Sequence, residues 1–227
     1  TEGSAELSSK CIERAEGNPL FLEHLLRSEH DGSERRIPPT VQSIVLESMD
    51  RLSSRDRSLL QTAAVLGQMF SLQSLRAVAR EPDGRVDPLE AAGMIRAIGT
   101  DLLFAHALIQ EAVYSSLLTS KRRELHARCA QWFAGSEPIL HAQHLDRADS
   151  PEAAQAYLAA SRLEAERFRF DTALRLAARA TELAPAADLG CALALLQGEL
   201  LRDTGQSNDS ILAFRRALDL AQHDNER

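Results

Sequence analysis

The chain has 227 residues, and its 26 Lys and Arg against 33 Asp and Glu give a formal net charge of −7. A protein that binds nucleic acid regardless of sequence needs a basic face that releases counterions, so this balance disfavours nucleic acid as a partner. Apolar residues make up 44 % of the chain and aromatic residues only 4 %. Ala and Leu are frequent, which favours helices and predicts few strands.

The three cysteines, Cys11, Cys129 and Cys191, lie far apart, and none has the spacing of a zinc-binding pair. An odd number of separated cysteines argues against a disulfide framework and indicates a reducing, cytoplasmic compartment. No apolar run is long enough to span a bilayer, and the polar residues 1–10 exclude a signal peptide, so no membrane partner is expected. The chain does not begin with Met, and we expect it to be a piece of a longer protein.

Apolar residues at helical spacing predict a short amphipathic helix over 5–16. Gly17-Asn18-Pro19 ends this helix, and Pro19 suits the first turn of a second helix over 20–27. The polar stretch 28–36 contains the turn-forming pair Asp31-Gly32 and is expected to be an exposed connection.

The next helices are predicted to begin near Thr40, at Ser53 or Ser54, at Ser71 and at Pro88. Ser caps the starts of helices and Pro suits their first turn. Residues 98–104 are the main strand candidate, and residues 99–101 can turn a small hairpin between 96–98 and 102–104, although short apolar runs leave strand and helix open. Helices are expected again over 107–118 and 120–133. Helices followed by a small hairpin are typical of a winged-helix domain.

Beyond residue 135 only helices are predicted, over 138–147, 151–167, 170–184, 188–204 and 207–222. Helices of this length joined by short turns indicate stacked hairpins. A shift of 37 residues aligns the last four helices in pairs, and it matches Ala173 with Ser210, Ala177 with Phe214, Ala180 with Ala217 and Leu183 with Leu220. Small residues at such positions let one helix approach another closely.

The first of these two copies resembles the tetratricopeptide pattern at Tyr157, Ser161, Phe170, Ala173, Ala180 and Pro185, and the second at Gly198, Gly205, Phe214 and Ala217. The family's usual period is 34 residues, so the resemblance implies a longer turn near 186–189. The alternative interpretation is an Ala-rich helical bundle without repeats.

Three segments together resemble a larger family: "RAEGNPLFLEHLLR" (14–27), "IPPTVQSIVLESMDRLSSRDRSLLQTAAVLGQMF" (37–70) and "LLFAHALIQEAVYSSLLTSKRRELHARCAQWF" (102–133). Their order and spacing are similar to the C-terminal part of the ATPase module of signal-transduction ATPases with numerous domains (STAND), as in bacterial regulators joined to a class III adenylate cyclase or a LuxR-type DNA-binding domain. In that family a P-loop domain binds ATP or ADP, a helical lid and a winged helix close over it, and tetratricopeptide-like repeats follow.

The resemblance implies two nucleotide contacts. Pro19 looks like the proline of the family's glycine-x-proline motif, which packs near the adenine. His106 looks like the histidine of its methionine-histidine-aspartate motif, which approaches the β-phosphate of ADP, but Ala107 replaces the aspartate. The alternatives are that Pro19 only starts a helix and that His106 is a structural residue.

No chemistry of its own is expected from this chain. It contains no GxxxxGK[ST] phosphate loop and no carboxylate pair after a strand, so no catalytic residue, no bound cofactor and no ATP hydrolysis are predicted for it. His141 and His144 have a spacing that can bind a metal, but no third ligand is evident and no metal site is predicted. The basic cluster of Lys121, Arg122, Arg123 and Arg128 is either a solvated helix face or a contact for a phosphate or an acidic partner.

The sequence therefore predicts an all-α fold with at most a minor β-hairpin: a remnant of the ATPase lid over 1–36, a winged-helix-like domain over 37–134 and tetratricopeptide-like repeats over 135–227. The expected function is regulatory, coupling the nucleotide state of an upstream P-loop domain in cis to a protein partner bound on the repeats. One alternative is a repeat scaffold that acts without nucleotide. The other is a DNA-binding regulator that uses the winged helix, which the acidic charge disfavours.

Overall fold

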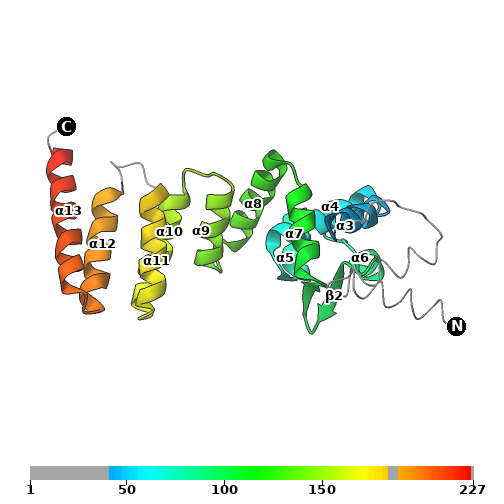
Figure 1. The fold of residues 1–227 in the computed structure, drawn as a ribbon, viewed down its shortest axis with the longest axis horizontal. Helices are drawn as coiled ribbons and strands as arrows, with labels where there is room; N and C mark the ends of the chain where they lie inside the picture. The colour runs from blue at the N-terminus through cyan, green and yellow to red at the C-terminus, as the bar shows by residue number, and fades with distance from the viewer. Residues whose placement is uncertain (1–40, 184–188, 226–227) are drawn as a thin grey trace, which may run out of the picture. The chain divides into compact units, whose positions relative to one another are not determined.

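The computed structural model describes residues 41–183 and 189–225. Helices make up most of this part of the chain, together with one small antiparallel sheet (Figure 1). The chain divides into two compact units, one that ends at Leu118 and one that begins at Thr119. The predicted all-α class with a minor β element is confirmed.

The described part of the first unit contains five helices, which are α3 (Val41–Asp50), α4 (Ser54–Leu66), α5 (Leu72–Ala79), α6 (Asp87–Ala91) and α7 (Ala107–Ser116). Two of them begin at serine caps: the Ser53 hydroxyl accepts the Asp56 amide at 3.1 Å, and the Ser71 hydroxyl accepts the Ser74 amide at 3.0 Å. Each cap satisfies an amide that has no partner inside the helix. The starts predicted at these serines are confirmed.

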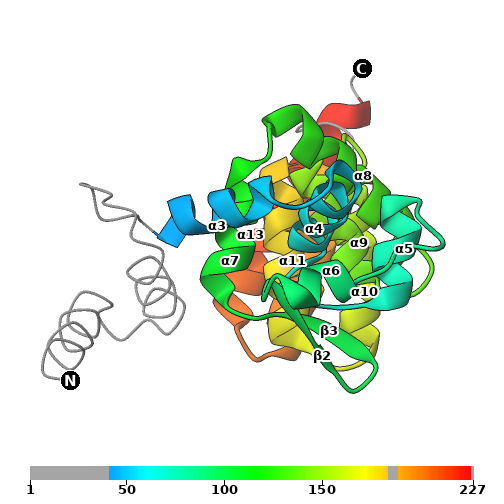
Figure 2. The same ribbon diagram turned by 90° about the vertical axis from the view of Figure 1, so that its right-hand side faces the viewer.

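The sheet consists of β1 (Met69–Ser71), β2 (Ile95–Ile98) and β3 (Asp101–Phe104), in the order β1-β3-β2. β2 and β3 form the predicted hairpin (Figure 2), and Gly99 takes the positive φ of 61° that its tight turn needs. β1 was not predicted, so the expectation of at most a hairpin is corrected. Three residues are too few to show an alternating pattern, and β1 exists because β3 offers it a paired edge.

The core of the first unit forms where the helices meet the inner face of this sheet. Phe104 is fully buried, and its ring lies 5.9 Å from that of Phe70 on the neighbouring strand. The Gln110 side chain on α7 donates to the Ala64 carbonyl on α4 at 2.7 Å. This bond ties the helix that follows the sheet to the helix that precedes it.

The second unit contains α8 (Thr119–Phe133), α9 (Pro138–Arg147), α10 (Ala153–Glu166), α11 (Phe170–Leu183), α12 (Gly190–Asp203) and α13 (Ser207–Asn225). Each helix packs on the next, which gives the hairpins α8–α9, α10–α11 and α12–α13 (Figure 1). α8 belongs to this stack because it packs on α9, whereas the sequence placed residues 119–134 with the preceding domain.

Two hydrogen bonds confirm the 37-residue shift. The Ser161 hydroxyl on α10 donates to the Ala173 carbonyl on α11 at 2.7 Å. In the next hairpin Ser210, the counterpart of Ala173, donates to the carbonyl of Gly198, the counterpart of Ser161, at 2.8 Å. The same buried contact therefore occurs twice with donor and acceptor exchanged between the helices. An Ala-rich bundle without repeats has no reason to show this correspondence.

The two hairpins distribute side-chain volume differently at equivalent positions. A Cβ added to Gly198 would lie 2.6 Å from the ring of Phe214, so the absence of a side chain at 198 makes room for that ring. The counterparts in the preceding hairpin are Ser161 and Ala177, both small. Each hairpin fills its interior with its own combination of side chains, since native cores leave few voids.

Ala180 tests the packing of the repeat directly. Its side chain is fully buried between helices, so Ala180→Leu is expected to lower the free energy of unfolding by about 1–3 kcal/mol. Ala178→Leu is the matched control, because Ala178 is exposed on the same helix and should change stability little. Urea unfolding followed by the fluorescence of Trp132, the one tryptophan of the chain, measures both. Equal losses for the two variants would contradict the hairpin register.

Within residues 41–183 and 189–225, no helix combines the length and the apolar character that crossing a membrane requires.

Candidate functional site

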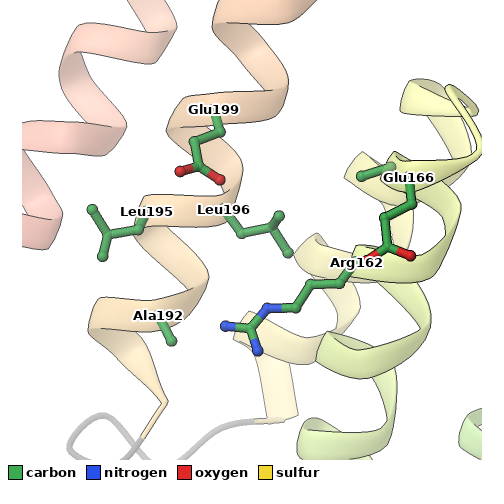
Figure 3. Close-up of a pocket in the computed structure, with 7 residues that line it drawn as sticks. Arg162, Glu166, Ala192, Leu195, Leu196 and Glu199 are labelled. Atoms are coloured by element: carbon green, nitrogen blue, oxygen red, sulfur yellow. The ribbon is translucent and has the colours of Figure 1, made fainter.

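α10 and α12 line an open groove of about 430 Å³ on the stack of hairpins (Figure 3). Its lining combines apolar and charged side chains: Arg162, Ala165 and Glu166 from α10, and Ala192, Leu195, Leu196 and Glu199 from α12. Leu196 points toward α10 and is almost completely buried, whereas Leu195 is 45 % exposed. The groove therefore has an apolar floor and offers an apolar side chain to solvent.

The charged side chains of this groove have no ion-pair partner among the residues that the structure describes. Arg162, Glu166 and Glu199 are exposed, and none of them takes part in an ion pair or side-chain hydrogen bond with another described residue. In Figure 3 the Arg162 side chain reaches across toward α12. A guanidinium and two carboxylates without internal partners can each accept a group of opposite charge from a bound molecule.

The repeat explains why opposite charges meet here. Arg162 and Glu199 are separated by 37 residues, so they occupy equivalent positions on the first helices of successive hairpins. The stack places these positions side by side along one face. An extended peptide that follows this face would meet one positive and two negative groups around an apolar surface, and such mixed chemistry is typical of sites that bind protein segments.

A second cluster of polar groups holds α9, α10 and α11 together. Asp146 on α9 accepts two hydrogen bonds from the Arg179 guanidinium, at 2.8 and 2.9 Å, and one from the Tyr157 hydroxyl at 3.2 Å. The bonds from Arg179 hold the pKa of Asp146 below its ordinary value, and burial beside this carboxylate raises the pKa of Tyr157 to about 12. The cluster stabilises the scaffold that carries the groove.

The resemblance implied nucleotide contacts for two residues, and the structure describes one of them. Pro19 lies outside the described residues. His106 lies at the junction of β3 and α7, where its Nδ1 accepts the Leu108 amide at 3.2 Å and caps the helix. This contact gives His106 the structural role that the sequence left open, and because Nδ1 is the acceptor, the neutral ring carries its proton on Nε2.

The histidines considered for a metal are held by separate partners. The Nδ1 of His141 lies 2.8 Å from the Ala130 carbonyl, and the Nδ1 of His144 lies 2.8 Å from the Nδ1 of His126. Among the described residues, no group of three or more His, Cys, Asp or Glu side chains is arranged to hold a metal ion. The arrangement is that of a packed helical hairpin.

The His126–His144 pair could not be found from the sequence, because its members lie on different helices and no motif spacing links them. Both side chains are almost completely buried. The Phe133 ring stacks on the His144 ring, with 5.5 Å between the ring centroids. Burial lowers the pKa of His126 to about 3 and that of His144 to about 4. Both imidazoles are therefore neutral at physiological pH, and one ring donates its proton to the other.

The basic cluster at the start of α8 is largely neutralised by carboxylates. Its ion pairs are Lys121 with Glu124 at 2.9 Å, Arg123 with Asp149 at 2.8 Å, and Arg128 with Glu124. These pairs favour the interpretation of the cluster as a solvated helix face.

No protein-family model and no curated protein matches the sequence of this chain. Among solved structures, the chain resembles a signal transduction ATPase with numerous domains (STAND) that has a tetratricopeptide repeat sensor, from Pyrococcus horikoshii. The TM-score is 0.50 and the sequence identity 12 %, over 97 % of this chain. The chain spans 41 % of the length of that protein. At this identity the likeness shows the fold, a STAND-like and tetratricopeptide-like helical architecture.

Proposed function

We propose that this chain is a regulatory region of a STAND-type ATPase and that its hairpins bind a protein partner in the groove between α10 and α12. The observation that carries the proposal is the groove itself, which has Leu196 at its apolar floor and Leu195 exposed at its edge. It is bordered by charges on α10 and α12 that have no partner among the described residues. The fold likeness supports it, since the solved protein is a STAND protein with a tetratricopeptide repeat sensor.

The groove favours a partner segment that carries both an apolar and a basic side chain. An apolar side chain would cover Leu195, which is otherwise exposed, and remove apolar surface from water. A Lys or Arg beside it would pair with Glu166 or Glu199, and a carboxylate would pair with Arg162. Pairing with both Arg162 and Glu199 would orient the segment, because these two opposite charges lie on different helices, α10 and α12.

The proposal assigns nucleotide chemistry to other parts of a larger protein. An upstream P-loop domain would bind ATP or ADP and hydrolyse it, and this chain would hydrolyse nothing itself. The helices and three-stranded sheet of the first unit would act as the winged-helix-type domain that follows such a module. His106 would contact the nucleotide through Nε2–H, because its Nδ1 is engaged by the Leu108 amide. The output domain, of the cyclase or LuxR type, would lie elsewhere in the protein.

A peptide selection tests the binding function. Peptides selected from a random library against the chain are expected to bind Leu195→Arg about tenfold or more weakly, because the charge blocks the apolar surface of the groove. Leu212→Arg is the control, since Leu212 is also an exposed leucine and lies on α13, outside the groove. Fluorescence anisotropy measures both affinities. Selected peptides that bind both variants equally would refute the groove as the binding site.

Nucleotide coupling is tested in the longer protein that contains the P-loop domain. Affinity for a selected peptide is expected to differ between the ATP and ADP states, and His106→Asn should reduce that difference. Asn at 106 can still cap α7, so the fold is retained while the imidazole is lost. Equal affinity in both nucleotide states would instead support the scaffold that acts without nucleotide.

A further inference from the structure

The turns after α10 and after α12 have the same backbone structure. Each turn closes with two hydrogen bonds from backbone amides to carbonyls of the preceding helix, and the second pair lies 37 residues after the first. In the first turn the amides of Phe168 and Arg169 donate to the carbonyls of Ala165 and Glu164, and in the second the amides of Gly205 and Gln206 donate to those of Arg202 and Leu201. This pattern places the residue after the helix in the left-handed region, where glycine is strongly preferred. The two turns therefore make the same demand on the chain.

The residues that meet this demand are very different. Gly205 has a φ of 79°, which glycine adopts without strain, whereas Phe168 has a φ of 60° and is 81 % exposed. Arg80 and Asp149 are the other described non-glycine residues with a positive φ, and both are polar. A bulky apolar residue in this region is a genuine outlier. Phe168 is thus both strained in its backbone and exposed in its side chain.

The fold itself gains little from the Phe168 ring. Phe170 contacts it edge-on at 6.1 Å between ring centroids, but most of the Phe168 surface faces solvent. A glycine would satisfy the same turn, as Gly205 shows in the next hairpin. Residues held in strained conformations that the fold does not need cluster at functional sites. The Phe168 side chain is therefore better suited to a contact with another molecule than to packing within the fold.

The two arginines next to Phe168 in the sequence are held in place by one buried carboxylate. Glu164 is almost completely buried and accepts Arg167 at 3.2 Å and Arg169 at 2.7 Å. About half of each arginine side chain stays exposed. The counterparts of these residues in the next hairpin are uncharged: Leu201, Thr204 and Gln206. The turn 167–169 therefore departs as a group from the equivalent turn of the next hairpin, and one carboxylate orders the guanidiniums of the two residues that flank Phe168 in the sequence.

We propose that the turn 167–169 is a second docking element, which inserts Phe168 into an apolar pocket rimmed by carboxylates on a protein partner. Aromatic and arginine side chains dominate the energy of protein interfaces. Here the two guanidiniums are already ordered by Glu164, so less conformational entropy is lost on binding. The element lies on the α10–α11 turn and shares no residue with the groove, so it does not depend on peptide binding there.

A protein surface fits this element better than a membrane or a nucleic acid. Glu166 and Asp171 are exposed on either side of the turn, and the whole chain has a net charge of −7. A continuous array of phosphates would attract the two arginines, but these carboxylates would repel it. Individual carboxylates around a pocket can face Arg167 and Arg169 and avoid Glu166 and Asp171.

The test uses the full chain and two labelled synthetic peptides, one with Leu and Trp between Asp and Glu residues and one with Lys and Arg in place of the acids. The acidic peptide is expected to bind, and Phe168→Gly should weaken this binding roughly tenfold or more. Phe168→Gly should also raise the melting temperature, because it removes the backbone strain. Loss of binding in that variant therefore cannot come from unfolding.

Two variants separate this element from other surfaces. Leu212→Gly removes another exposed apolar side chain, on α13, and Leu195→Arg blocks the groove; both should bind the acidic peptide as the unmodified chain does. The proposal is overturned if the acidic peptide does not bind, if Phe168→Gly binds it equally well, or if the basic peptide binds better. It is also overturned if the Phe168-dependent binding is to phosphatidylserine vesicles or a single-stranded oligonucleotide rather than to the peptide.

Discussion

Gly198→Ala is expected to lower the free energy of unfolding by about 1–3 kcal/mol, although alanine has the higher helix propensity. The added Cβ would lie 2.6 Å from two atoms of the Phe214 ring and 2.9 Å from a third. The ring must therefore move out of its place between α12 and α13. Urea unfolding monitored by Trp132 fluorescence measures the loss.

A double-mutant cycle makes this result specific. Phe214→Ala should destabilise by roughly 2–3 kcal/mol, below the range for a fully buried phenylalanine because Phe214 is half-buried. With alanine at both positions the clash disappears, so the double variant should lose less than the sum of the two single losses. The preceding hairpin already carries two small residues there, Ser161 and Ala177.

Gly135→Ala is the control for glycine replacement. A Cβ at Gly135 would meet nothing within 4 Å, so this variant should leave stability nearly unchanged. Additive losses at 198 and 214, or an equal loss at 135, would show that the close contact in the third hairpin is not as the structure places it.

Acid is expected to destabilise the second unit through the His126–His144 pair. Burial is the main cause that lowers both pKa values, and the neighbouring Arg147 lowers both further. Because an unfolded histidine has a pKa of about 6.5, the unfolded chain binds protons below that pH while the folded pair does not. Stability is therefore fully present above pH 6.5 and falls as the pH decreases toward the folded values of about 3 and 4.

The expected loss between pH 7 and pH 5 is roughly 2 kcal/mol for each imidazole. Urea unfolding at several pH values measures it, and Trp132 on α8 reports the hairpin that contains the pair. The double variant His126→Leu and His144→Leu removes both groups and should flatten the dependence in this range. If the unmodified chain and the double variant respond to pH in the same way, the pair is not the acid-sensitive element.

Features that depend on neighbouring residues were determined by the sequence alone. The Ser53 and Ser71 caps and the turn at Gly99 follow from the hydrogen-bonding and φ preferences of single residues. The 37-residue shift was visible because the buried small residues Ala180 and Ala217 recur at the same helical positions. Local propensity and helical periodicity carry this information, so the helical class and the repeats could be predicted.

Contacts between distant segments were decided by the tertiary structure. β1 exists only because β3 pairs with it, and α8 joins the repeats only because it packs on α9. In both cases the sequence offers a segment that could serve several roles, and the partner brought beside it by folding selects one. The cap that His106 provides is by contrast a local contact, because Leu108 is its neighbour but one in the chain.

The proposed binding surfaces were also decided by the tertiary structure. Arg162 and Glu199 are ordinary exposed helix residues in the sequence, and they become opposite borders of one groove when successive hairpins stack. Phe168 likewise reads as one more apolar residue near a helix end, and only its backbone angle and exposure distinguish it from Gly205. Sequence determined the repeating scaffold through local preferences, whereas the stacking of its hairpins decided which side chains stay exposed and unpaired.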